Sequence, residues 1–215
     1  RSINHKRKEL IGQQNGKRLS SVRRIERVHP IAGKRVVAMT FDDGPCAKDF
    51  MGRGKGLTPS ILDTLAEYGA RATFDIIGTT EGNYPDEAGE KGSSAFGGIK
   101  FDHYPCFGED LLAGAKNQQA LVRRMIDEGH ELASHTWQHR IFGRKRLIYG
   151  NRVPLQSMDE VMEDLRTLHT YIENEFSYEI KLARPPHYVD AVTGGGSTYD
   201  AYRRMGYQYL AASFD

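Results

Sequence analysis

The chain is most tightly constrained by an apolar, β-branched run that begins at Val36 and ends in Asp42-Asp43-Gly44-Pro45. The run predicts a buried strand, and the Gly-Pro pair predicts the turn that ends it. Adjacent residues on a strand point to opposite faces, but at a strand end that turns, both acids can serve one pocket. Because buried carboxylates are costly without compensation, the pair indicates a metal ion or a cationic partner nearby.

A second motif, Ser-His-Thr-Trp-Gln-His, places His135 and His139 four residues apart. On a helical turn these positions share a face, so both rings can reach one ion. Two histidines and one carboxylate, with open positions for water, are typical of a hydrolytic Zn²⁺ site or a related divalent-metal site. The alternative is that the histidines lie on the surface and the acids form an ordinary turn. The presence of both motifs in one chain favours the metal site.

Thr-Phe-Asp-Asp-Gly-Pro at 40–45 and His-Thr-x-x-His at 135–139 are followed by Arg-Pro-Pro at 184–186. With these motifs the chain resembles the polysaccharide deacetylase family, the NodB-homology domain of carbohydrate esterase family 4, over residues 35–215. The resemblance implies an α/β fold, a distorted (β/α) barrel. The pattern of strand, active residue at the strand's carboxyl end, then helix is consistent with a parallel sheet that carries its chemistry at that end.

The resemblance also implies roles for single residues. Asp43, His135 and His139 are expected to hold a divalent metal ion, Zn²⁺ by preference, with Co²⁺ and Ni²⁺ as alternatives that this ligand set does not exclude. Asp42 is expected to be the general base and Arg184 to orient it. The alternative for Arg184 is an ordinary cation at a strand end.

The substrate side of the predicted site follows the Arg-Pro-Pro motif. Pro185, His187 and Tyr188 are expected to lie there, and a backbone N–H at this place helps to bind the oxyanion in the family. His187 stands where the family commonly has an aromatic residue, which leaves the backbone donor in place. Asp215 resembles the first acid of a later family motif that tunes the catalytic machinery.

The family's downstream Leu-x-His motif, whose histidine is a general acid, has no match up to Asp215. The favoured interpretation is a C-terminally incomplete domain, with the closing strand and its histidine supplied by another segment. The alternative is a member without that acid. For such a member we expect weak or no turnover on an intact metal site, because proton donation contributes about 10²–10⁴-fold to the rate.

Charge divides the chain into a basic arm, residues 1–34, and a catalytic domain, residues 35–215. Eleven Lys and Arg against two Glu give residues 1–35 a formal charge of +9, which leaves −7 for the remaining 180 residues. The arm favours contact with an anionic cell-envelope polymer, and a solvated lead-in segment is the alternative. No base-reading chemistry is present, so nucleic acid is not an expected partner.

No apolar run reaches membrane-spanning length, and a signal peptide or anchor before Arg1 would not be visible in these residues. Together with the family resemblance, this predicts an extracellular or envelope-associated protein. Cys46 and Cys106 are either joined by a disulfide that pins a loop over the site or both reduced. Two insertions relative to the family, residues 78–116 and 140–155, are expected beside the substrate groove.

Hydrophobic periodicity predicts strands at 72–77, 131–133, 180–183 and 207–212 and helices at 58–68, 118–128, 157–173 and 197–205. Within the first of these strands, Asp75 is an acid where the family usually has an apolar residue. It must face the pocket or find a partner.

The function that these features predict is metal-dependent removal of acetyl groups from a polysaccharide. N-acetylglucosamine units of peptidoglycan or of a chitin-type polymer are the expected substrate. The alternatives are an acetylxylan esterase and a catalytically weak, metal-containing carbohydrate-binding relative.

Overall fold

The computed structural model describes residues 21–27, 33, 35–49, 52, 54–81, 109–143 and 154–213. No helix in these ranges is long and apolar enough to cross a membrane. The elements are, in chain order, β1 (Arg24–Ile25), β2 (Thr40–Gly44), α2 (Leu57–Glu67), β3 (Thr73–Ile76), α3 (Gln119–Asp127), β4 (Glu131–Ser134), α4 (Met158–Phe176), β5 (Leu182–Ala183), a 3₁₀ turn (Pro186–Tyr188), α5 (Thr198–Met205) and β6 (Gln208–Leu210).

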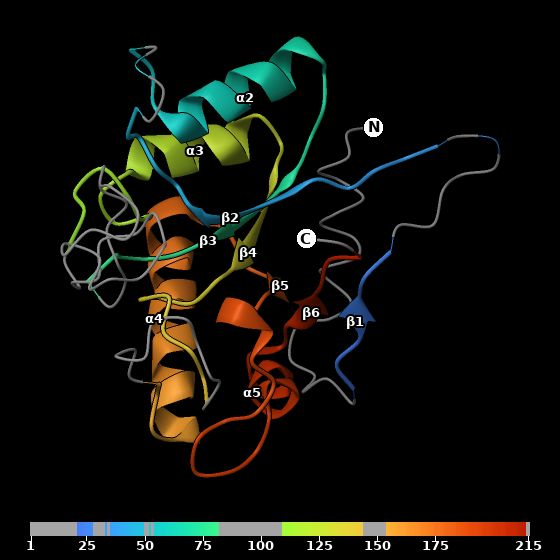
Figure 1. Ribbon diagram of the computed structural model, residues 1–215, viewed down its shortest axis with the longest axis vertical. Helices are drawn as coiled ribbons and strands as arrows, with labels where there is room; N and C mark the ends of the chain where they lie inside the picture. The colour runs from blue at the N-terminus through green and yellow to red at the C-terminus, as the bar shows by residue number, and fades with distance from the viewer. Residues whose placement is uncertain are drawn as a thin grey trace, which may run out of the picture.

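All six strands form one parallel sheet in the order β1-β6-β5-β4-β3-β2 (Figure 1). From β2 to β6 each strand pairs with the next along the chain, and a helix connects each consecutive pair. This alternation confirms the predicted α/β class with a parallel sheet. β1 and β2 are the edge strands, and within the described ranges no pairing joins them, so the barrel is open on this side.

The first strand comes from the predicted basic arm. β1 pairs with β6, with Arg24 opposite Tyr209 and Ile25 opposite Leu210, and the Arg24 guanidinium lies 4.8 Å from the centre of the Tyr209 ring. The predicted domain boundary after residue 34 therefore cuts through the sheet. Residues 1–20 and 28–32 lie outside the described residues, so contact of the arm with an anionic polymer stays a prediction.

The strand that carries the two acids begins later than the sequence predicts. β2 starts at Thr40, and the residues before it are not in the sheet. Val36, Val37 and Met39 have 46%, 75% and 47% of their surface exposed, so the prediction of a buried strand from Val36 is wrong. Hydrophobic character alone cannot distinguish a core strand from an apolar edge segment that faces an open side of the sheet.

The helices begin where their capping residues allow. In α4 the Ser157 side chain caps the helix, because its hydroxyl accepts a hydrogen bond from the Glu160 N–H at 3.2 Å. The apolar residues of α4 repeat at helical spacing and are buried in the core. α2 begins one residue before the predicted start at 58, because Gly56 is the N-cap and Thr58 lies inside the helix. There the Thr58 hydroxyl accepts a hydrogen bond from the Cys46 N–H at 2.8 Å, which ties α2 to the end of β2.

Both predicted insertions lie largely outside the described residues, which omit 82–108 and 144–153. Cys106 falls in the first gap, so its pairing with Cys46 stays a prediction.

Candidate active site

The two adjacent acids at the end of β2 serve one pocket because the strand is irregular there. The β2–β3 register shifts between Asp42 and Gly44, and Asp43 has a left-handed backbone with φ of 65°. An inserted residue of this kind re-aims the side chains of a strand. Asp42 and Asp43 therefore do not point to strictly opposite faces, which is the behaviour that the sequence predicts for a strand end that turns.

The histidine motif follows β4 and forms a loop, so the predicted helical turn is wrong. Thr136 and His139 have left-handed φ values of 78° and 53°, and residues 135–140 are not helical. The turn brings His135 and His139 to ring centres 4.9 Å apart. The two imidazoles thus share one target, as predicted, through backbone geometry that spacing alone does not reveal.

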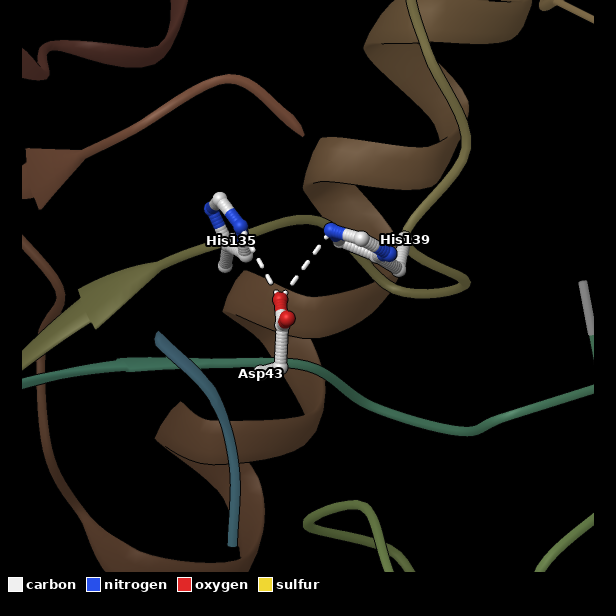
Figure 2. Close-up of side chains that lie close together, drawn as sticks. All are labelled: Asp43, His135 and His139. Carbon is white, nitrogen blue, oxygen red and sulfur yellow. Dashed lines mark ion pairs between the residues drawn. The ribbon is translucent and has the colours of Figure 1, made fainter. Parts of the chain in front are cut away.

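Asp43, His135 and His139 converge on one point (Figure 2). Asp43 Oδ1 lies 3.2 Å from His135 Nε2 and 3.0 Å from His139 Nε2, and the possible ligand atoms all lie within 4.8 Å of one another. The imidazoles are buried, while the Asp43 side chain is 56% exposed. The group is closed on the protein side and open on the solvent side.

The chemistry of this donor set fits a divalent cation. The carbonyl oxygen of Arg184 accepts the His135 Nδ1–H at 2.8 Å, which leaves Nε2 of the neutral ring as a lone pair facing Asp43. Burial would lower the pKa of His135, but the Asp43 carboxylate raises that pKa to about 9. Although desolvation would raise the pKa of Asp43, the two imidazoles hold it well below its usual range. The three side chains therefore favour a positive charge between them. A bound metal ion would supply that charge in place of a proton.

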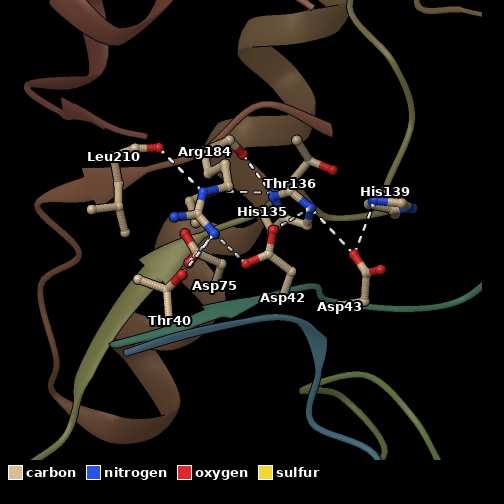
Figure 3. A network of polar contacts seen from close by, with 10 residues as sticks. Thr40, Asp42, Asp43, Asp75, His135, Thr136, His139, Arg184 and Leu210 are labelled. Atoms are coloured by element: carbon tan, nitrogen blue, oxygen red, sulfur yellow. Dashed lines mark hydrogen bonds and ion pairs between the residues drawn. The ribbon is translucent and has the colours of Figure 1, made fainter. Parts of the chain in front are cut away.

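Beside these ligands, the buried Arg184 forms an ion pair with Asp42, which is partly exposed (Figure 3). Arg184 follows β5, is 2% exposed, and donates from Nη1 to Asp42 Oδ1. The same Nη1 donates to the Thr40 hydroxyl at 3.1 Å, and Nε donates to the Leu210 carbonyl oxygen at 3.2 Å. The other oxygen of Asp42, Oδ2, lies 3.9 Å from His135 Nε2. One oxygen of Asp42 is thus held by Arg184, and the other borders the metal ligands.

The residues after Arg184 line the same region. Pro185 is buried and is the N-cap of the 3₁₀ turn, in which His187 has a left-handed φ of 55°. The His187 ring centre lies 5.5 Å from that of His139, and the Tyr188 ring lies 5.7 Å from the Arg184 guanidinium carbon. The structure therefore brings all but one of the predicted site residues together. Asp215 lies outside the described residues, so its role stays a prediction.

Sequence reasoning missed Asp164, a buried acid on α4. Its carboxylate accepts the N–H groups of Trp137 at 2.7 Å and Gln138 at 3.3 Å, so it fixes the loop between the two histidines. Burial raises the pKa of Asp164 to about 6, against these two hydrogen bonds. The signal that could have found it is an acid on the otherwise apolar face of α4, next to Val161 and Leu165.

A cleft of about 820 Å³ opens between the edge strands β1 and β2. Asp42, Asp43 and Arg184 line it together with the exposed apolar residues before β2. Neither His135 nor His139 is among its lining residues, so the cleft borders the site only on the side of Asp42, Asp43 and Arg184.

Comparison with known proteins gives a single family. The sequence model described as polysaccharide deacetylase matches residues 30–210. A peptidoglycan-N-acetylmuramic acid deacetylase of Bacillus subtilis, PdaC, is 27% identical over 85% of this chain and 27% of its own length. A chitooligosaccharide deacetylase of a Bradyrhizobium species is 29% identical over 65% of this chain and 42% of its own length. The chain thus spans well under half of these curated relatives.

Solved structures with the same fold include a mutant of Bacillus subtilis PdaC. It has a TM-score of 0.50 and 22% identity over 83% of this chain and 59% of its own. A CE4 family pseudoenzyme, mutated so that activity is restored, has a TM-score of 0.51 and 18% identity over 89% of this chain and 48% of its own. At these identities the likeness shows a shared fold.

Proposed function

Since this chain belongs to the polysaccharide deacetylase family, we propose that it is a metal-dependent hydrolase that removes acetyl groups from N-acetylated sugars of a polysaccharide. The observation that carries the proposal is the Asp43, His135 and His139 group with Asp42 at its edge. Amide hydrolysis by water requires an activated water molecule and a general base. A cation-binding group beside a carboxylate held by Arg184 can supply both.

Asp43, His135 and His139 would hold the metal ion, Zn²⁺ by preference. When bound, such an ion supplies a Lewis acid that activates water and polarises the acetyl carbonyl. The carbonyl oxygen of Arg184 fixes the His135 ring, and the Asp164 carboxylate fixes the loop that carries His139. Partners of this kind raise the basicity of the ligands and set their orientation.

Asp42 is the residue that takes the proton of the attacking water. Its Oδ1 is held by Arg184, so Oδ2 is the oxygen left for this transfer, and Oδ2 faces the metal ligands. The Asp42 side chain is 33% exposed, so water can reach it.

The substrate side is assigned to the turn after Arg184. His187 lies next to His139, so an acetyl group bound at the ligands would meet the backbone and ring of His187. A backbone N–H in this turn is the donor that we assign to the developing oxyanion. Pro185 and Tyr188 hold the turn in place against Arg184.

For the substrate we propose N-acetylated amino sugars of peptidoglycan or of a chitin-type polymer. This rests on the names of the relatives, which are peptidoglycan and chitooligosaccharide deacetylases. A polymer of this kind places the protein outside the cell or at its envelope. An acetylxylan esterase and a weakly active carbohydrate-binding relative are the competing functions.

The test is release of acetate from N-acetylglucosamine oligomers, peptidoglycan and acetylxylan, by this chain and by the full-length gene product. Each substrate is assayed with added Zn²⁺ and with a chelator. Chelator-sensitive acetate from the amino-sugar polymers is the expected result. Acetate from acetylxylan alone would replace the proposal with an esterase. Binding of sugar and Zn²⁺ by the full-length product without any acetate would make it a binding relative.

A further inference from the structure

A buried acid, Asp75, lies in the middle of β3 and has no part in the chemistry above. Its side chain is fully buried, between the apolar residues Phe74 and Ile76, which are 2% and 0% exposed. Neither carboxyl oxygen of Asp75 has a hydrogen-bond donor among the described residues. Burying such a group is costly, so its presence needs an explanation.

The strand register places Asp75 directly beside the proposed base. Asp42 on β2 and Asp75 on β3 are paired positions of neighbouring parallel strands. Arg184 Nη1 lies 3.3 Å from Asp75 Oδ2 and also donates to Asp42 Oδ1. Figure 3 shows both carboxyl groups directed at this one guanidinium. A single nitrogen of Arg184 therefore lies between two acids.

Arg184 in turn connects Asp75 to the rest of the site. Its Nε is fixed by the Leu210 carbonyl, and its own carbonyl oxygen accepts the His135 Nδ1–H. A shift of Arg184 would move its contact with Asp42 and also the anchor of a proposed metal ligand. Asp75 lies against the same Nη1 from the side of β3.

The charges support a neutral Asp75. Burial raises its pKa to about 8, Arg184 opposes this, and the Asp42 carboxylate raises it further. The groups that face Asp75 are Asp42 from β2, Arg184 after β5, His135 after β4 and the Tyr202 hydroxyl from α5. In its neutral form Asp75 carries an O–H donor next to a carboxylate acceptor. Arg184 then balances the charge of Asp42 alone.

We propose that Asp75 is a positioning residue: it fixes Arg184 and the first oxygen of Asp42, so that the second oxygen of Asp42 stays directed at the metal ligands. This inference rests on the proposed deacetylation, because the direction of Asp42 affects the rate only if Asp42 acts as the base. The proposal differs from a structural role in what it predicts. The loss of Asp75 slows the chemical step while the protein stays folded.

The experiment compares Asp75→Leu and Asp75→Asn with a control variant, Leu168→Ala, in the zinc-loaded full-length protein. Leucine removes the polar group and keeps the branching of the side chain, asparagine keeps a donor for Asp42, and Leu168 lies in the core on α4. For Asp75→Leu we expect kcat to fall about 10- to 100-fold, as for a displaced catalytic group, with KM changed less than about twofold. Its thermal midpoint stays level or rises, because a buried acid is removed.

For Asp75→Asn we expect kcat within about threefold of the parent, because the amide replaces the O–H donor. For Leu168→Ala we expect a lower thermal midpoint with kcat preserved well below that midpoint. A parent-like kcat in Asp75→Leu would overturn the proposal. So would a loss of kcat in Asp75→Leu that appears only together with a loss of folded protein.

Crystal structures of the parent and of Asp75→Leu give an answer that does not depend on turnover. We expect the Asp42 carboxylate to leave Arg184 or to rotate in the variant, and unchanged Asp42–Arg184 contacts would overturn the inference. If the parent releases no acetate, the proposed function fails, while this comparison still decides whether Asp75 positions Asp42.

Discussion

Two groups of charged side chains lie side by side at the carboxyl ends of the strands, and they differ in how their charge is balanced. Asp43, His135 and His139 contain no permanent cation, and their possible ligand atoms face one another. Asp42 and Asp75 surround Arg184, a permanent cation. The proposed metal ion would balance the charge of the first group, whereas Arg184 balances the second from within the protein. Neighbouring acids of one motif thus belong to different chemical environments, and the division falls between Asp42 and Asp43.

Asp42→Asn gives the largest expected effect. The amide cannot take a proton from water, so we expect acetate release to fall about 10²–10⁴-fold. Zn²⁺ affinity should stay within a few-fold of the parent, because Asp42 is not among the three ligands. Initial rates of acetate release and competition with a fluorescent chelator measure the two quantities. An equal loss of Zn²⁺ affinity would mean that Asp42 also helps to bind the ion, so that the two groups are not separate.

Asp43→Ala reverses this pattern. With one of three ligands removed, we expect Zn²⁺ affinity to fall by more than about 100-fold, since even the outer partners of ligands contribute 10- to 100-fold. Activity should fall in parallel and recover partly at high Zn²⁺ concentration. Isothermal titration calorimetry with Zn²⁺ checks this. Parent-like affinity in Asp43→Ala would remove the proposed metal site.

The first group should also respond to pH. The pKa of His135 is raised to about 9 in the metal-free protein, so at pH 7 a bound ion must displace a proton. Affinity for Zn²⁺ should therefore rise about tenfold per pH unit for each displaced proton and level off above that pKa. Competition titrations from pH 6.5 to 9 measure it. A flat profile would mean that His135 does not hold the ion.

The smallest effect is expected at Asp164. Its carboxylate contacts the first group only indirectly, through the backbone of the loop between the two histidines. In Asp164→Ala the N–H groups of Trp137 and Gln138 lose their acceptor, and the loop that carries His139 loosens. We expect Zn²⁺ affinity to fall about tenfold. Glu163→Ala, on the exposed side of α4, is the matched control and should not change the affinity. Equal affinities in both variants would show that Asp164 serves stability alone.

The sequence predicts the identity of the site residues better than their geometry. Asp42, Asp43, His135, His139 and Arg184 follow from three motifs, and the structure brings them together. The turn that joins the two histidines could not be predicted, because left-handed residues such as Thr136 leave no trace in hydrophobic periodicity. Their individual roles stay predictions until variants are measured.

The fold shows the same limit. β3, β4 and the four helices are found by periodicity, because each buries a regular apolar face. β1 was missed, since a two-residue strand in a basic segment has no periodicity and is held by its partner β6. The apolar run before Thr40 is wrongly predicted as a buried strand for the opposite reason. Its composition is typical of a strand, but one side of it has no neighbouring strand.

The pairing of β1 with β6 also bears on how the chain is made. Arg23 donates its N–H to the side chain of Gln208, a partner 185 residues further along. During synthesis at about 5–20 residues per second, the residues of β1 leave the ribosome roughly ten seconds or more before their partner exists. The sheet can grow from β2 onward in that time, and β1 joins last. Contacts so distant in sequence slow folding, so β1 is expected to be the last of the described strands to be ordered.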